Sequence, residues 1–214
     1  MHIDLRVLEL LASKLCHDLV SPVSAINNGV ELIEDIGGDV VDEAMKLIGD
    51  SAGQAARRLR FFRIAYGRAG SEENLAVKDV RPIAEQCLGT GKVTLNWPED
   101  SPGDEIAAHR GSLKTLINML ALGEELLAYG GSLSVQKALV PGQKECRVVI
   151  AGRSVQLSPP LQGALEDAIP LDDLTPRTIQ AYITGRFAAH FGLKIGHVQE
   201  TPEQLVLTLL PAVD

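Results

Sequence analysis

The sequence predicts an α+β protein, with an antiparallel helical hairpin at residues 1–70 followed by a helix-covered sheet at residues 71–214. Through the first 70 residues, apolar side chains recur every three or four positions, the period of a helix with one buried face. Beyond residue 70, short β-prone runs alternate with longer helical runs, and no internal repeat is found. The two patterns predict two domains in sequence.

The first predicted helix carries one continuous apolar stripe. The stripe consists of Leu8, Leu11, Leu15, Leu19, Val23, Ile26, Val30 and Ile33. We expect the helix to end near Ile36, because the pair Gly37-Gly38 can supply the positive φ of a helix stop. Asp39 is suited to cap the helix that follows.

The second predicted helix has the spacing of a coiled-coil seam. Its apolar residues alternate in steps of four and three, at Val41, Met45, Ile48, Ala52, Ala55, Leu59, Phe62 and Tyr66. Two helices alone cannot enclose stripes of this length, so we expect a homodimer whose two hairpins form a four-helix bundle. The alternative is that both stripes pack on the remainder of the same chain.

Residues 71–214 are predicted to form a degenerate α/β sandwich, a sheet with helices on one face. The expected strands are 75–77, 93–97, 132–139, 146–151, 194–198 and 204–210. The expected helices are 80–88, 110–128, 160–168 and 176–191.

Composition narrows the function classes. The net charge of −8 disfavours nucleic acid and anionic membranes as partners of the whole chain. No apolar run approaches the ~20 residues of a membrane helix, and no secretory signal is apparent. Cys16, Cys87 and Cys146 lack ligand spacing, as expected of reduced thiols. We therefore expect a soluble, cytoplasmic protein.

His17 is the first candidate functional residue. It lies two positions from both Leu15 and Leu19, about 200° of helical rotation, so it faces away from the apolar stripe. Its expected neighbours on the outer face are small or polar, namely Ser13, Lys14, Ser21, Ser24 and Asn28. Pro22 removes the amide that would bond the carbonyl of Asp18, which predicts a kink or loosened turn beside the histidine. The imidazole is therefore expected to be exposed and available for chemistry.

The run from His17 to Pro22, His-Asp-Leu-Val-Ser-Pro, resembles the phosphoacceptor box of dimeric histidine kinases, and residues 71–214 resemble the kinase ATPase domain in element order. The resemblance implies that His17 is phosphorylated. Asn118 would belong to the kinase asparagine box, but its second asparagine, a magnesium ligand in the kinases, falls on Leu122. The adenine-binding positions are Gly152, Ser154 and Gln156, and only Gly185 remains of the glycine-rich lid.

These departures leave no apparent means of holding ATP. A retained phosphoacceptor box beside a degenerate ATPase domain resembles the ChpT-type histidine phosphotransferases of alphaproteobacteria. This resemblance implies that a phosphoryl group passes through His17, from the receiver domain of a hybrid histidine kinase to response regulators. It also implies no cofactor of the chain's own, because the partner receiver domain supplies the magnesium.

The resemblance gives Asp18 the role of holding the second ring N–H of His17; the alternative is an ordinary surface acid. Lys14 and Ser21 are candidate partner contacts. If the hairpin turns near residues 37 and 38, Arg57 and Arg58 lie level with His17 and could contact the phosphoryl group or the acidic pocket of a receiver. The alternative is a solvated basic face near the end of the second helix.

Two other functions stay open at this stage. A divergent ATP-dependent histidine kinase predicts labelling of His17 by ATP without a second protein. A non-enzymatic dimeric scaffold or kinase inhibitor predicts partner binding that survives His17→Ala, with no phosphohistidine.

Overall fold

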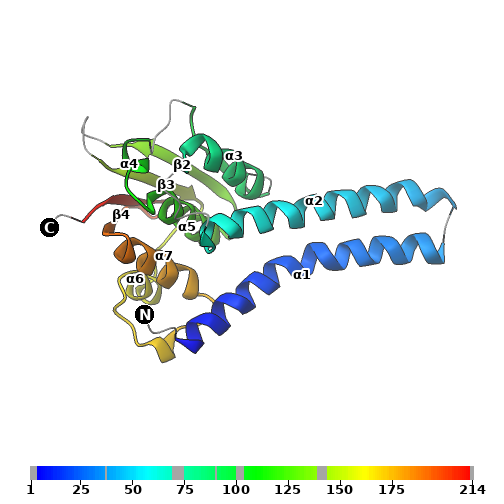
Figure 1. The fold of residues 1–214 in the computed structure, drawn as a ribbon, viewed down its shortest axis with the longest axis horizontal. Helices are drawn as coiled ribbons and strands as arrows, with labels where there is room; N and C mark the ends of the chain where they lie inside the picture. Colours follow the sequence, from blue (N-terminus) through cyan, green and yellow to red (C-terminus); the bar gives the residue numbers. More distant parts are fainter. Residues whose placement is uncertain are drawn as a thin grey trace.

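The computed structural model describes residues 4–36, 38–68, 75–89, 91–99, 104–138 and 144–212. Two long helices, α1 (Leu5–Asp35) and α2 (Val41–Ala65), form an antiparallel hairpin that projects from a compact α/β unit (Figure 1). The predicted α+β class and the N-terminal hairpin are confirmed. The expected domain boundary at residue 70 lies outside the described residues.

The hairpin begins and turns at recognisable signals. The Asp4 carboxylate accepts a hydrogen bond of 2.9 Å from the Arg6 amide and caps α1. Gly38 has the predicted positive φ, at 58°. The expected cap at Asp39 is wrong, since Asp39 falls within a 3-10 turn, η1 (Gly38–Val40), and Val40 holds the N-cap position of α2. The extra turn places the start of α2 later than the sequence pattern predicted.

The two helices of the hairpin approach closely at Gly29. A Cβ atom there would lie 2.6 Å from Cγ1 of Ile48 and 3.3 Å from the Ala44 carbonyl oxygen. Pro22 is buried, and α1 remains helical on both sides of it. In Figure 1, α1 is inclined to α2 over its first half and runs beside α2 over its second half. The direction of α1 therefore changes along its length, as expected from Pro22, and the helix continues past the proline.

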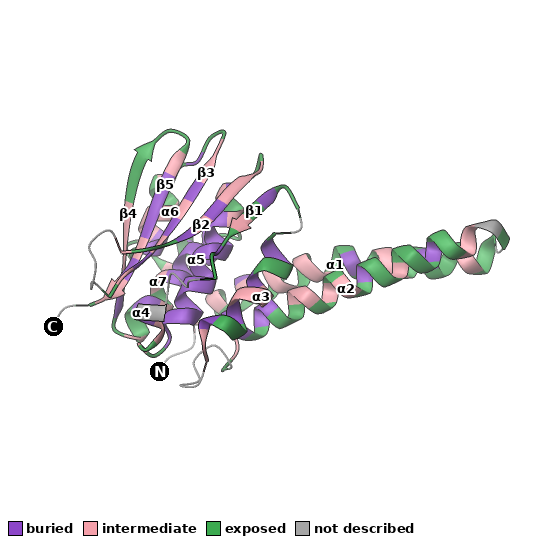
Figure 2. Ribbon diagram, turned by 90° about the horizontal axis from the view of Figure 1, so that it is seen from above, coloured by how far each residue is buried: buried purple, intermediate pink, exposed green. Residues whose placement is uncertain are grey.

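The α/β unit is a five-stranded sheet in the order β1-β2-β3-β5-β4. Its strands are β1 (Val93–Asn96), β2 (Gly131–Lys137), β3 (Cys146–Gly152), β4 (Leu193–Thr201) and β5 (Gln204–Pro211). β1 and β2 are parallel and all other pairs are antiparallel. Along β3, buried residues alternate with less buried ones, as in a sheet with one covered face (Figure 2).

Helices cover that face, as predicted. They are α3 (Val77–Leu88), α4 (Asp104–Ala107), α5 (Ser112–Leu126), α6 (Pro159–Leu165) and α7 (Ile179–His190), with a 3-10 turn η3 (Leu171–Asp173). The predicted strand at 75–77 is wrong, because Val77 is the first residue of α3. The Asp79 carboxylate accepts a hydrogen bond from the Ala76 amide and so stabilises the helix start. The short α4 was not predicted.

The base of the hairpin is anchored in the α/β unit by buried and partly buried hydrogen bonds. Asn118 on α5 donates through Nδ2 to the Ala65 carbonyl oxygen at 2.8 Å, and the Tyr66 hydroxyl donates to Oε1 of Gln180 on α7 at 2.7 Å. At the start of α1, the Arg6 guanidinium donates to the Leu174 carbonyl at 2.8 Å. Both helices of the hairpin are therefore tied to the second unit at one end.

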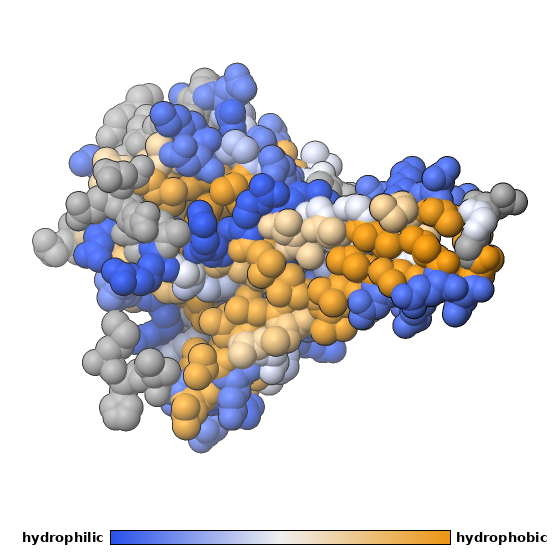
Figure 3. Space-filling view, turned by 45° about the vertical axis from the view of Figure 1, so that its right-hand side comes forward, coloured by the Kyte–Doolittle hydropathy of each residue, from blue (hydrophilic) through white to orange (hydrophobic). Residues whose placement is uncertain are grey.

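Away from this base, the hairpin exposes much of its apolar surface. Figure 3 shows a continuous hydrophobic band along it. The exposed large apolar residues of the hairpin are Leu5, Leu8, Val20, Val23, Val30, Leu32, Ile36, Met45, Leu47 and Leu59. The alternative that the stripes pack on the same chain holds only near the base, where Phe62 is buried and Leu11, Leu15 and Leu19 are partly buried against the core.

Candidate functional site

His17 lies on α1 with its side chain 89% exposed, which confirms the predicted accessibility of the imidazole. Its Nδ1 is 3.5 Å from Oδ1 of Asp18, the next residue. Ser21, one turn further along α1, is also exposed. The carboxylate therefore stands beside one ring nitrogen, while solvent reaches most of the imidazole.

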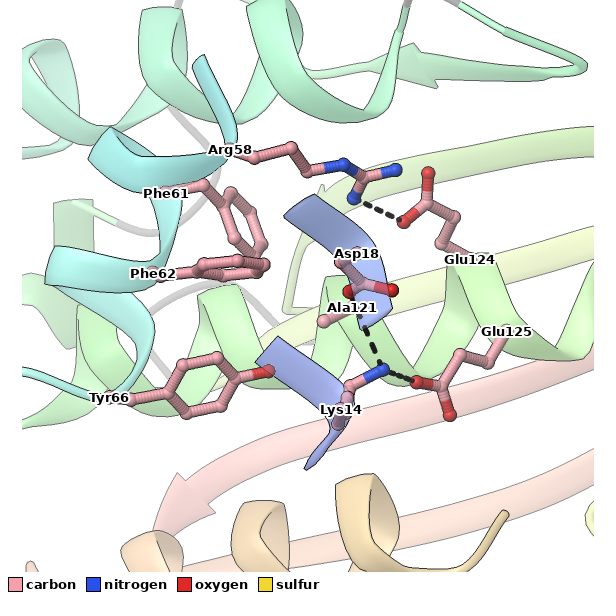
Figure 4. A pocket seen from close by; sticks show the side chains of 9 residues that line it. All are labelled: Lys14, Asp18, Arg58, Phe61, Phe62, Tyr66, Ala121, Glu124 and Glu125. Atoms are coloured by element: carbon pink, nitrogen blue, oxygen red, sulfur yellow. Dashed lines mark hydrogen bonds and ion pairs between the residues drawn. The ribbon is translucent and has the colours of Figure 1, made fainter. Parts of the chain in front are cut away.

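The helical pattern predicted Lys14 on the outer face of α1, but its side chain is only 16% exposed. Its ammonium forms an ion pair with Glu125 on α5 and lies 4.0 Å from Oδ2 of Asp18 (Figure 4). The helical pattern alone could not reveal that α5 approaches this side of α1 and supplies a carboxylate for the long side chain.

The two arginines predicted to lie level with His17 point to different places. Arg58 pairs with Glu124 of α5 at 3.4 Å and lines the same cavity as Asp18. Burial lowers the pKa of Arg58, but the negative charge of Glu124 and its neighbours outweighs this and raises the pKa above its usual value. Arg57 lines a second, smaller hollow with Gln86, which Arg58 and Glu124 also border but Asp18 does not. The structure therefore brings Arg58, and not Arg57, into the cavity beside Asp18.

The cavity lies between the hairpin and α5 and has a volume of about 210 Å³. It is lined by Lys14, Asp18, Arg58, Phe61, Phe62, Tyr66, Ala121, Glu124 and Glu125. In Figure 4 the aromatic rings of α2 stand opposite the glutamates of α5. Three carboxylates and two cations thus meet where the hairpin joins the α/β unit.

Burial raises the pKa of Glu124, an effect that the charge of Arg58 opposes. Burial likewise raises the pKa of Glu125, opposed by Lys14 and reinforced by Asp18. Both glutamates were missed in the sequence. The available sequence signal was an acidic pair near the end of the predicted helix 110–128, directly after the largely apolar run 116–123.

The two asparagine-box positions of the kinase resemblance, Asn118 and Leu122, are packed into the protein interior here. Asn118 is fully buried, and its Oδ1 accepts a hydrogen bond of 3.1 Å from Nε2 of Gln180. Leu122 is also fully buried. Across the described ranges, no group of three or more His, Cys, Asp or Glu side chains is arranged to hold a metal ion. Among the described helices, none has the length and apolar character needed to span a bilayer.

Comparison with known proteins gives a consistent result. Residues 77–202 match the family model of the histidine phosphotransferase C-terminal domain. Protein phosphotransferase ChpT of Brucella abortus (strain 2308) is 34% identical over 200 residues, covering 93% of this chain and 92% of that protein. A bacterial phosphotransferase solved at 1.7 Å is 30% identical and superposes with a TM-score of 0.75, covering 98% of both chains.

Proposed function

Because the chain belongs to the histidine phosphotransferase family, which includes ChpT, we propose that His17 is its phosphoryl carrier. The family makes it a protein-histidine phosphotransferase of a phosphorelay. The donor is proposed to be the receiver domain of a hybrid histidine kinase, and the acceptors are response regulators. The relay is proposed to operate in the cytoplasm. Exposed Ser21 and half-buried Arg57 are proposed to contribute to the receiver-binding surface.

The observation that carries the proposal is the position of the His17 imidazole. Its side chain is 89% exposed, with Nδ1 beside Asp18. If Asp18 accepts the Nδ1–H, the lone pair of Nε2 is free to attack the phosphorus of an aspartyl phosphate. The N–P bond forms as the P–O bond to aspartate breaks, and the aspartate leaves as a carboxylate. The Nδ1 proton stays on the ring, and the reverse sequence passes the phosphoryl group to the acceptor.

No cofactor of the chain's own is needed for this exchange. The magnesium ion that neutralises the transferring phosphoryl group is proposed to be bound by the partner receiver. The kinase-type magnesium site does not fit this chain, because Leu122 offers no ligand atom at the corresponding position. We therefore propose a phosphotransferase that does not use ATP.

The apolar band of the hairpin supports a homodimer. Exposed Leu8, Val23, Met45 and Leu59 lie on the predicted seams of α1 and α2, where a second hairpin would complete a four-helix bundle. Met45→Glu and Leu59→Glu are expected to give the monomer mass in light scattering. Lys46→Glu, an exposed neighbour outside the seam, is the matched control. A monomeric wild-type protein contradicts the dimer.

The transfer reaction is tested with a receiver domain that carries labelled aspartyl phosphate. Wild-type chain, His17→Gln and His190→Gln are each incubated with this receiver, and a parallel sample receives labelled ATP alone. His190 is a matched control because it is also an exposed helical histidine. The label is expected on the wild type and on His190→Gln, but not on His17→Gln.

The stability of the label identifies the bond, because phosphohistidine is labile in acid and survives base. Labelling by ATP alone would instead indicate an autokinase. If the chain takes no label from any competent receiver, and His17→Gln still binds the receiver, the result would favour a scaffold.

A further inference from the structure

We infer that Glu125 and Lys14 are positioning residues for His17, acting through Asp18. This inference rests on the proposed function of His17. Four charged or titratable groups stand in a line from α5 to the imidazole, and they alternate in character: carboxylate, ammonium, carboxylate and imidazole. The structure thereby assigns a role at the phosphoacceptor histidine to a glutamate of the C-terminal domain.

The contacts define the order of this line. Lys14 forms an ion pair with Glu125, and its Nζ lies 4.0 Å from Oδ2 of Asp18. Oδ1 of Asp18 lies 3.5 Å from Nδ1 of His17. The two carboxylate oxygens of Asp18 therefore face different partners, one on the domain side and the other on the imidazole side. Fixing the first oxygen restricts rotation of the carboxylate and so orients the second.

Burial gives this arrangement its strength. The side chains of Lys14 and Asp18 are 16% and 25% exposed, whereas His17 is 89% exposed. The line thus begins at the domain junction, where screening by water is reduced, and ends at the open imidazole. An ion pair between two fully exposed side chains would be mobile and weakly coupled, whereas Asp18 is held on its partly buried side by Lys14.

The surrounding charges leave Lys14 as the cation that orients the Asp18 carboxylate. The charged or titratable groups lining the cavity are Lys14 and Asp18 from α1, Arg58 and Tyr66 from α2, and Glu124 and Glu125 from α5. Arg58 is engaged by Glu124 at 3.4 Å. Loss of Lys14 would leave Asp18 facing two neighbouring carboxylates, with Arg58 as the one remaining cation of the cavity.

The orientation of Asp18 has a chemical consequence at His17. A carboxylate held beside Nδ1 favours the neutral tautomer that carries its proton on Nδ1. That tautomer presents the lone pair of Nε2 to the partner. Disturbing Glu125 or Lys14 should therefore lower the rate of phosphoryl transfer without preventing the receiver from binding.

The test measures the His17 tautomer directly, on the full-length protein labelled with ¹⁵N and ¹³C at histidine. Spectra are recorded well above the ordinary imidazole pKa of about 6.5, and His17→Gln identifies the His17 signal. Lys14→Met and Glu125→Gln are expected to shift the tautomer ratio away from the Nδ1–H form, and Asp18→Asn gives the largest shift. Lys14→Arg should restore the wild-type ratio, and Lys46→Met is the control for removal of one exposed α-helical lysine.

Transfer kinetics provide the second readout. Lys14→Met and Glu125→Gln should each lower kcat for transfer from a phosphorylated receiver by about tenfold, with KM nearly unchanged. An unchanged tautomer ratio in both variants overturns the inference, whatever happens to the rate. Glu125→Gln keeps the shape of the side chain and leaves α1 unaltered, so it tests the line even if Lys14→Met misfolds. If the variants show the tautomer shifts but the wild-type protein accepts no phosphoryl group from any receiver, the proposed function is refuted and the inference about Glu125 and Lys14 is not.

Discussion

Asn118→Ala tests whether buried hydrogen bonds hold the hairpin to the α/β unit. The Asn118 carboxamide donates to the Ala65 carbonyl at 2.8 Å and to the Lys114 carbonyl at 2.9 Å, and accepts from Gln180 at 3.1 Å. Because Asn118 is fully buried, water cannot replace these bonds. Substitution by alanine removes the tie between α5, the end of α2 and α7.

The size of the effect follows from the groups left behind. A buried carbonyl without its donor costs about 1–3 kcal/mol, and the weakened bond to Gln180 adds about 1 kcal/mol. The better helix propensity of alanine returns roughly 0.5 kcal/mol. We expect a net loss of about 2–3 kcal/mol in the free energy of unfolding, a roughly 30- to 150-fold change in the unfolding equilibrium.

The assay is urea denaturation of the full chain, followed by circular dichroism at one fixed protein concentration because a dimer would make stability concentration-dependent. Asn28→Ala, an exposed asparagine on α1, is the matched control and should change stability by less than about 0.5 kcal/mol. In a double-mutant cycle, Asn118→Ala and Gln180→Ala should be non-additive. A loss below about 1 kcal/mol, or strict additivity, would refute the reasoning.

Three further outcomes are expected. Gly185→Ala should destabilise the protein by about 3 kcal/mol or more, measured by urea denaturation, because its Cβ would lie 1.9 Å from the Leu165 carbonyl oxygen and force α7 away from α6. Burial lowers the pKa of Lys114 from 10.5 to about 8, so the unfolded chain binds more protons between these values, and the wild type should gain stability relative to Lys114→Met as the pH rises from about 8 to 10.5. Cys16 is exposed, whereas Cys87 is buried and burial raises its thiol pKa to about 11, so an alkylating reagent at pH 8 should modify Cys16 first, as peptide mass spectrometry can show.

Each of these outcomes has its own control. Gly49→Ala lies in α2 with nothing within 4 Å of the added Cβ, and it should stabilise the helix by about 0.5–1 kcal/mol. Relative to Lys46→Met, which replaces an exposed lysine, the wild type should show no comparable gain in stability as the pH rises. A wild type that loses stability relative to Lys114→Met over this pH range contradicts the lowered pKa of Lys114. Alkylation of Cys87 at the rate of Cys16 in the folded protein would contradict its burial.

The sequence predicted the hairpin and most strands because their signals are local and periodic. The exposure of His17 followed from helical geometry alone. The predicted strand at 75–77 failed because its β-prone residues were weighed without the hydrogen bond from the Ala76 amide to Asp79, which starts a helix there.

The contacts between the hairpin and α5 could not be predicted from local sequence patterns. Arg57 and Arg58 are adjacent in sequence, but about 100° of helical rotation separates them, and only the position of α5 decides which one meets a carboxylate. Lys14 was assigned outward for the same reason. Glu124 and Glu125 became candidates only when α5 was seen to lie beside α1 and α2 (Figure 4).

The open position of His17 limits how the proposed relay through it can be organised. One exposed nitrogen must serve donor and acceptor, and partners of similar shape would approach it over the same surface of α1. The two proteins then compete for occupancy, so each visit excludes the other. An acceptor that remains bound after phosphorylation, or binds before the histidine is charged, blocks reloading. Flux through the protein should consequently pass through a maximum as acceptor concentration rises, and the abundance of the acceptor would itself set the strength of the signal.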